Sequence, residues 1–108
     1  MTDITLQDIS KEGEKYVIDY LKGNSFKNIT MDMWQHSIND IKADSWAENI
    51  LVQVKTSMFP NEPPDISRDD RIKIISRAIT IKRNPYVAYV KIERDNKLLK
   101  SIRWEKLS

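Results

Sequence analysis

The sequence contains no cysteine and only one histidine among its 108 residues. The absence of cysteine excludes disulfide bonds and thiolate metal sites, and a single histidine cannot complete the usual zinc ligand sets. Any metal bound by this chain would therefore be a hard ion held by oxygen atoms. The sequence also has no repeat and no low-complexity tract, so nothing in it indicates a linker between domains.

Long apolar runs are absent as well. No stretch is long and apolar enough to span a bilayer, and the opening residues MTDITLQDIS lack the basic and apolar regions of a signal peptide. We therefore expect a cytoplasmic protein that does not contact a membrane. The length, with 40% hydrophobic residues, fits a single domain over residues 1–108 with one modest core.

The net charge is only +2, but it is unevenly spread along the chain. Up to Asp65 there are six Lys and Arg against eleven Asp and Glu, which gives −5, and from Arg68 onward there are twelve against five, which gives +7. An acidic half could hold a metal ion while a basic half holds phosphates. A solvated basic helix and hairpin would explain the same pattern equally well.

Apolar periodicity predicts a first helix over residues 11–22, with Ser10 as its N-cap and Gly23 just beyond its end. Alternating and β-branched segments predict five strands. These strands cover residues 26–33, 37–44, 49–56, 86–93 and 98–104. The four residues 45–48 are short enough for a hairpin turn between the second and third strands.

A second helix is predicted between the third and fourth strands. Three of the four prolines lie in residues 59–65, which must form a loop. Ser67, with Asp70 three residues later, is typical of a capping box, and the apolar stripe continues to about Arg83, where Asn84-Pro85 ends the helix. The order is α-β-β-β-α-β-β, an α/β fold with a mixed sheet flanked by helices. Because a helix connects them, the third and fourth strands should be parallel and the other pairs antiparallel.

Four polar residues stand where apolar ones would be expected or would serve as well. Glu14 lies near the apolar face of the first helix, Asp40 lies in the second strand, and Gln53 and Lys55 interrupt the third. In a hairpin, the three strand residues can project from one face of the sheet, and a nearby helix can bring Glu14 to them. A divalent metal would compensate the carboxylates, and the lysine could orient or deprotonate a water. The plain alternative is a polar sheet face exposed to water.

The run Asp40-Ile41-Lys42-Ala43, followed after nine residues by Gln53-Val54-Lys55, resembles the D-I-x-A … E/Q-x-K core of the PD-(D/E)XK nucleases. Glu14 resembles the glutamate of their first helix. The later segments ISRDDRIKIISRAITIKRNPYVAYVKI and SIRWEKL resemble the archaeal Holliday-junction resolvases of this superfamily. The likeness covers the chain from about Lys11 to Trp104.

This resemblance implies a restriction-endonuclease-like fold and a metal-dependent endonuclease that hydrolyses DNA, with branched DNA as the first candidate. It implies Mg²⁺ or Mn²⁺ as the cofactor, with no small-molecule cofactor, and a homodimer, since a four-way junction needs two symmetric cuts. By resemblance, Asp40, Gln53, Glu14 and the main-chain carbonyl of Val54 hold the metal, and Lys55 is the catalytic lysine.

The sequence departs from the resolvases in two places. Gln53 stands where they usually carry glutamate, although glutamine occurs in Mrr-type restriction endonucleases, and the loss of one negative charge weakens metal binding. The segment MDMWQHSIN is nearly uncharged where resolvases have a basic, serine-rich loop. The alternative is therefore a catalytically degenerate nuclease-fold module that binds nucleic acid or another protein.

Other residues could take part in the same function. Asp44 could replace Asp40 as a metal ligand, His36 could serve as a general base or phosphate contact, and Trp46 could stack on a base. Each of these could equally be a solvated surface residue. The basic residues that we expect to contact phosphates are Arg68, Arg71, Arg77, Lys82, Arg83 and Lys97.

Overall fold

The computed structural model of the chain describes residues 6–35, 38–94 and 98–107. Its elements are α1 (Leu6–Gly23), β1 (Lys27–Gln35), β2 (Ile38–Asp44), β3 (Asn49–Met58), α2 (Arg68–Thr80), β4 (Asn84–Arg94) and β5 (Leu98–Lys106). This is the predicted order. The strands form one five-stranded sheet in the order β1-β2-β3-β4-β5.

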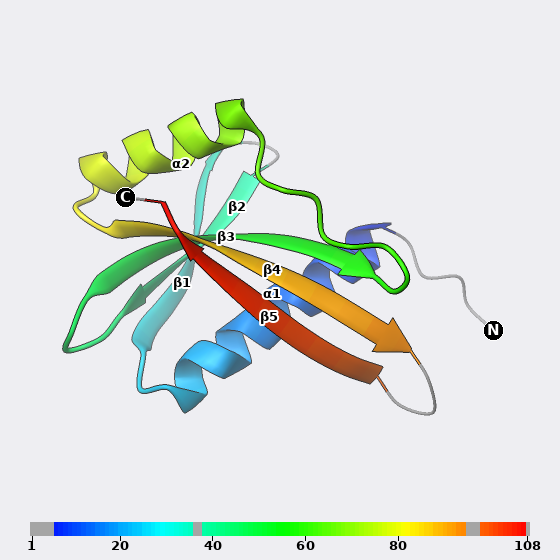
Figure 1. Ribbon diagram of the computed structural model, residues 1–108. Coiled ribbons are helices and arrows are strands. Elements are labelled where there is room, and N and C mark those ends of the chain that lie inside the picture. Colours follow the sequence, from blue (N-terminus) through cyan, green and yellow to red (C-terminus); the bar gives the residue numbers. More distant parts are fainter. Residues whose placement is uncertain (1–5, 36–37, 95–97, 108) are drawn as a thin grey trace.

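The pairing of the strands also agrees with the prediction. β3 and β4 are parallel, and the other three neighbouring pairs are antiparallel. The helix α2 provides the crossover between the two parallel strands. Figure 1 shows α1 and α2 on opposite faces of the twisted sheet. The chain therefore has an α/β architecture with a mixed sheet between two helices.

The first helix is longer than predicted. It begins at Leu6, so Ser10 lies inside the helix and is not its N-cap. Ile9 packs against the core together with Val17, which is eight residues later, so the apolar stripe continues one turn beyond the predicted start. Gly23 is the last helical residue and does not adopt a left-handed conformation, which occurs instead at Ser25 with φ 68°.

The second helix starts as predicted and ends earlier. The Ser67 hydroxyl accepts a hydrogen bond from the backbone N–H of Asp70, which confirms the N-cap. The helix ends at Thr80, not near Arg83, because Lys82 is left-handed with φ 59° and turns the chain away. The Asn84-Pro85 pair, predicted to end the helix, instead opens β4.

Two separate apolar clusters lie on the two faces of the sheet. Alternate residues of β3 supply them, because Ile50 and Val52 belong to one cluster and Leu51 to the other. The first cluster packs against α1 and contains Val17, Leu21, Ile41, Ala43, Ile50, Val52, Ala88, Val90 and Ile92. The second packs against α2 and contains Leu51, Ile66, Ile74, Ala78, Val87 and Tyr89.

The helix α1 lies very close to β3 at Gly13. A Cβ atom added there would be 1.8 Å from Thr56 Oγ1 and 2.8 Å from Thr56 Cβ, so only glycine fits at this position without a shift. The absence of a side chain at residue 13 thus sets the distance between helix and sheet.

Candidate functional site

The centre of the candidate site is a pair of polar residues on adjacent strands. Asp40 of β2 lies directly opposite Gln53 of β3 in the antiparallel register. Both are buried, with exposed fractions of 0% and 6%. Lys55, two residues after Gln53, projects from the same face. Because Leu51 also projects from this face and packs in the α2 cluster, the three residues lie on the α2 side of the sheet.

A further acid joins this pair from the neighbouring strand. Asp32 of β1 lies opposite Asp40 and is 5% exposed. Asp32, Asp40 and Gln53 thus form a row across three strands, which we call the polar row. They are the buried polar or charged side chains among the described residues. The sequence pattern did not single out Asp32, whose only signal is an acid between two methionines within a predicted strand.

Arg77 of α2 lies over the polar row and compensates its charge. Its guanidinium donates to both carboxylate oxygens of Asp32, at 2.9 and 3.0 Å. These hydrogen bonds lower the pKa of Asp32. The charge of Asp40 also acts on Arg77 and, with that of Asp32, raises its pKa, the hydrogen bond to Asp32 being the larger cause. One cation therefore serves two buried carboxyl groups.

Lys55 lies at the margin of the row, beside the first turn of α2. Its Nζ donates to Asp70 Oδ2 at 3.2 Å, and the two side chains are 23% and 25% exposed. The ammonium group is therefore held in place and still accessible to solvent. It is the part of the candidate site that a substrate could reach most directly.

Glu14 lies on the other side of the sheet. Its helix α1 packs against the face opposite the polar row. Glu12 and Tyr16 both bond to Lys100 of β5, so Glu14, two residues from each, lies on the flank of α1 that faces away from β5. Burial raises the pKa of Glu14. The structure brings Asp40, Gln53 and Lys55 to one face and does not bring Glu14 to them.

Three of the predicted phosphate contacts are bound to acids within the fold. Arg71 donates to Glu105 at 3.3 Å, and Arg77 holds Asp32 as described above. Arg83 donates to Asp44 Oδ1 at 2.6 Å and to the carbonyl groups of Ala43 and Ile50, so it connects the turn between α2 and β4 to the β2–β3 hairpin. Arg77 and Arg83 are thus held by well-covered acids, whereas the Arg71–Glu105 pair is more exposed.

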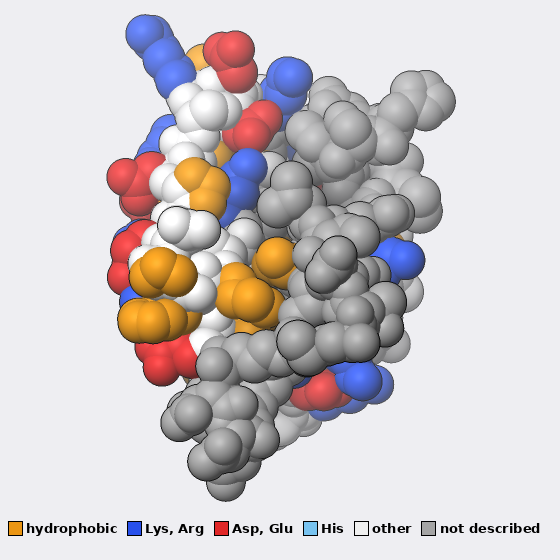
Figure 2. Space-filling view, turned by 90° about the vertical axis from the view of Figure 1, so that its right-hand side faces the viewer, with side chains coloured by type: hydrophobic (Ala, Val, Ile, Leu, Met, Phe, Trp, Pro, Cys, Tyr) orange, Lys and Arg blue, Asp and Glu red, His pale blue; other side chains and the backbone are white. Residues whose placement is uncertain are grey.

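Some of the remaining candidates are exposed, and others lie outside the residues that the structure describes. Arg68 and Lys82 are exposed, and His36 and Lys97 lie outside the described residues. Trp46 is 95% exposed in the turn between β2 and β3. Figure 2 looks at the end of the sheet where β3 and β4 finish, and the coloured side chains there alternate between basic and acidic, with hydrophobic ones gathered among them. The coloured part of this surface has no continuous basic patch.

The polar row offers the oxygen donors that a hard divalent ion requires, namely carboxylates and an amide. Asp32 is held by Arg77, and Asp40 and Gln53, which lie opposite each other, are the donors that we consider for an ion. Within the described ranges, no three or more His, Cys, Asp or Glu side chains form a group that could hold a metal. The donor chemistry fits Mg²⁺ or Mn²⁺, and the low negative charge of the set predicts weak binding.

Comparisons with known proteins give no relative. No family model, curated protein or solved structure matches this chain. In the part of the chain that the structure describes, neither helix is long and apolar enough to cross a membrane. The polar row and its surroundings are therefore the features of this chain that bear on its function.

Proposed function

We propose that this protein is a metal-dependent endonuclease that hydrolyses DNA, with branched DNA as its first candidate substrate. The proposal is carried by one observation, the register that sets buried Asp40 opposite buried Gln53 on the face that also presents Lys55. A homodimer is part of the proposal, because two cuts in a branched substrate call for two related sites.

Burial of the polar row is what argues for a function. A buried carboxylate is unfavourable unless it is compensated, and an apolar residue of similar size at Asp40 would fill the same space without that penalty. Strands β2 and β3 are otherwise apolar at their buried positions beside this pair. A row of this kind fits a site that must hold an ion.

In the proposed site, Asp40 and Gln53 hold Mg²⁺ or Mn²⁺, and the main-chain carbonyl of Val54 is a further candidate ligand. The ion supplies charge stabilisation at the scissile phosphate. Lys55 positions the attacking water through its ammonium group, which Asp70 keeps beside the row. We leave Glu14 out of the ligand set because its helix packs against the other face.

A second candidate function is a nuclease-fold module that binds nucleic acid or protein without cutting. The observation that favours it is the bidentate contact of Arg77 with Asp32, since a guanidinium already compensates the buried charge that an ion would otherwise neutralise. In that case the polar row would serve structure alone.

The decisive experiment is incubation of the folded protein with a four-way junction and with duplex DNA, in Mg²⁺ and in Mn²⁺. The endonuclease proposal expects cut products that disappear when EDTA is added. Intact DNA after prolonged incubation, with a preparation whose circular dichroism shows helices and strands, would contradict it.

Gln53→Glu separates the two candidate functions. In an active enzyme the change should alter cutting only modestly, whereas in a degenerate site it should raise the affinity for Mn²⁺ without producing activity. Asn49→Asp, at an exposed position of the same strand, adds the same charge outside the row and serves as the matched control.

A further inference from the structure

A hollow of about 420 Å³ lies on the α2 side of the sheet, next to Lys55. Tyr89, which contributes to its floor, is the partner of Lys55 in the parallel β3–β4 register, and Arg103 is the partner of Tyr89 on β5. Lys91 and Ser101 are opposite each other one step further along the same face. We call this hollow the loop pocket, because residues of the β3–α2 loop, Glu62, Pro63 and Asp65, form its wall.

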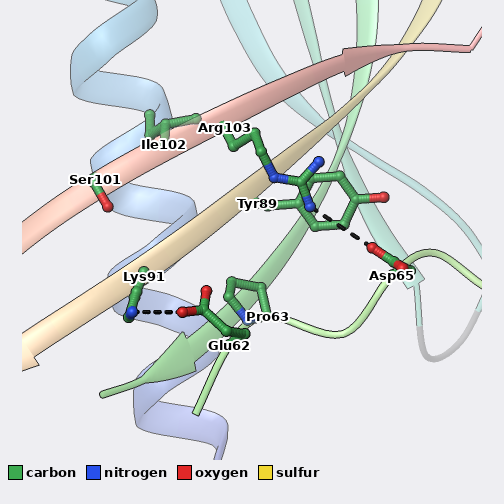
Figure 3. A pocket seen from close by; sticks show the side chains of 8 residues that line it. All are labelled: Glu62, Pro63, Asp65, Tyr89, Lys91, Ser101, Ile102 and Arg103. Carbon is green, nitrogen blue, oxygen red and sulfur yellow. Dashed lines mark hydrogen bonds and ion pairs between the residues drawn. The ribbon is translucent and has the colours of Figure 1, made fainter. Parts of the chain in front are cut away.

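The charges of the loop pocket are divided between two kinds of structure. Its cations, Lys91 and Arg103, come from strands, and its anions, Glu62 and Asp65, come from the loop. Figure 3 shows the loop acids reaching across the hollow to the strand cations. The chain's own carboxylates thus occupy the places where an anionic ligand would sit.

Both cations stand on the rigid part of the fold, because Lys91 and Arg103 belong to paired strands of the sheet. The Arg103 guanidinium lies 4.1 Å from the centre of the Tyr89 ring, which is itself buried and bonded through its hydroxyl to Glu105 at 2.9 Å. Lys91 is the eighth residue of the eleven-residue strand β4, and its side chain is only 23% exposed. The sheet therefore fixes the backbone of both cations, and the Tyr89 ring supports the guanidinium of Arg103, whose side chain is 63% exposed.

The acids are held far more loosely. Arg103 and Asp65 are 3.7 Å apart, and the Asp65 side chain is 91% exposed. Glu62 accepts from Lys91 at 2.6 Å but is 73% exposed, and this hydrogen bond raises the pKa of Lys91. Ion pairs with such exposed carboxylates contribute little to stability, so a phosphate could displace the two acids.

We infer that the loop pocket binds a phosphate of a nucleic-acid strand beside Lys55, through Lys91 and Arg103, and that Glu62 and Asp65 occupy these cations until the strand displaces them. The inference rests on the proposed function, because the bound strand would be the one presented to Lys55. The Ser101 hydroxyl provides a further donor at the same level of the sheet.

The test is binding of a fluorescent oligonucleotide in EDTA, where no cutting occurs, followed by anisotropy over a range of salt concentrations. Lys91→Gln and Arg103→Gln should each weaken binding about tenfold near 50 mM salt and lower the slope of log affinity against log salt by about 1. Lys106→Gln, an exposed lysine that lies outside the pocket on β5, is the matched control. Equal behaviour of all three variants would overturn the inference.

The acids give the opposite and more specific expectation. Glu62→Gln and Asp65→Asn should strengthen oligonucleotide binding more than Asp19→Asn, which removes an exposed acid from α1. A gain no larger than that of the control would refute the role of the loop acids. Inorganic phosphate is tested alone in parallel, and a pocket that binds free phosphate but no oligonucleotide would refute a strand site.

Cutting is measured separately with Mn²⁺, so that the two proposals fail independently. A wild-type protein that binds through the loop pocket and leaves DNA intact refutes the endonuclease and supports the pocket. A protein that cuts DNA while the Lys91 and Arg103 variants bind normally supports the endonuclease and refutes the pocket.

Discussion

The two faces of the sheet are built from opposite kinds of residue. The α1 face buries a continuous apolar cluster that reaches from β2 across to β4. The α2 face has a smaller apolar cluster under the helix, and beside it lie the buried Asp32, Asp40 and Gln53. Both faces belong to the same strands, and alternate residues of a single strand serve one or the other.

This difference indicates that one face of this small domain supplies most of the stability, while the other face presents polar groups. The apolar face supplies hydrophobic stabilisation, at roughly 25 cal/mol for each Å² of apolar surface buried. The polar face holds groups that lower stability unless each has a compensating contact. A chain of 108 residues can carry such a face only because the other face stabilises the fold.

The largest effect that we expect is on catalysis. Lys55→Ala should lower the rate of DNA cutting by about 10² to 10⁴, because it removes the proposed ammonium group that positions the attacking water. Oligonucleotide binding and the melting temperature should change little. Lys15→Ala, an exposed lysine of α1, provides the control. Full activity of the Lys55 variant would contradict the proposed catalytic role of Lys55 on the α2 face.

A substitution on the apolar face should do the reverse. Leu21 is 1% exposed in the α1 cluster, and Leu21→Ala should lower the free energy of unfolding by about 2 to 5 kcal/mol through lost burial and a cavity. Urea unfolding measures the change. Below the melting transition the rate of cutting should match that of the wild type. A loss of activity in the folded variant would show that the α1 face does more than stabilise the fold.

Arg77→Met tests the compensation of the polar row. Without its partner, buried Asp32 should destabilise the fold by about 3 kcal/mol. The wild-type pKa of Asp32 is lowered, so its pair stabilises the protein above the ordinary carboxyl value near 4 and is lost as pH falls through the lower folded value. The melting temperature of the variant should therefore depend less on pH in this acidic range, and Asp32→Asn in the same chain should restore part of the stability.

Glu14→Gln should change stability and cutting the least. The substitution tests whether Glu14 belongs to the proposed active site or only to the α1 face. Burial raises the pKa of Glu14, so its contribution is present below the ordinary value near 4.3 and is lost as pH rises through the folded value. The variant should thus be slightly more stable than the wild type at pH 7, with no difference at pH 3. Cutting should be unchanged, and a large loss of activity would show that Glu14 reaches the metal after all.

Much of the site could be predicted because it depends on local pairing. The four-residue turn between β2 and β3 fixes their register, so the opposition of Asp40 and Gln53 follows from the alternation of the two strands. The face covered by α2 is also constrained, since a crossover between parallel strands is right-handed. These rules use neighbouring segments only.

The remaining features depend on contacts that no local pattern encodes. Arg77 and Asp32 are 45 residues apart, and nothing in the periodicity of α2 distinguishes a paired arginine from a solvated one. No handedness rule applies to α1, because this helix precedes the first strand. Its side of the sheet, and with it the place of Glu14, is decided by packing of the whole core.

The close approach at Gly13 has a consequence for the opposite face. Thr56, which touches the helix there, is adjacent in β3 to Lys55, whose amine points the other way. The strand β3 is thus packed against α1 directly behind Lys55, the proposed catalytic lysine. A methyl group at residue 13 would displace Thr56 and with it this part of β3. A substitution in α1 could therefore shift the amine of Lys55 without changing any residue of the polar row.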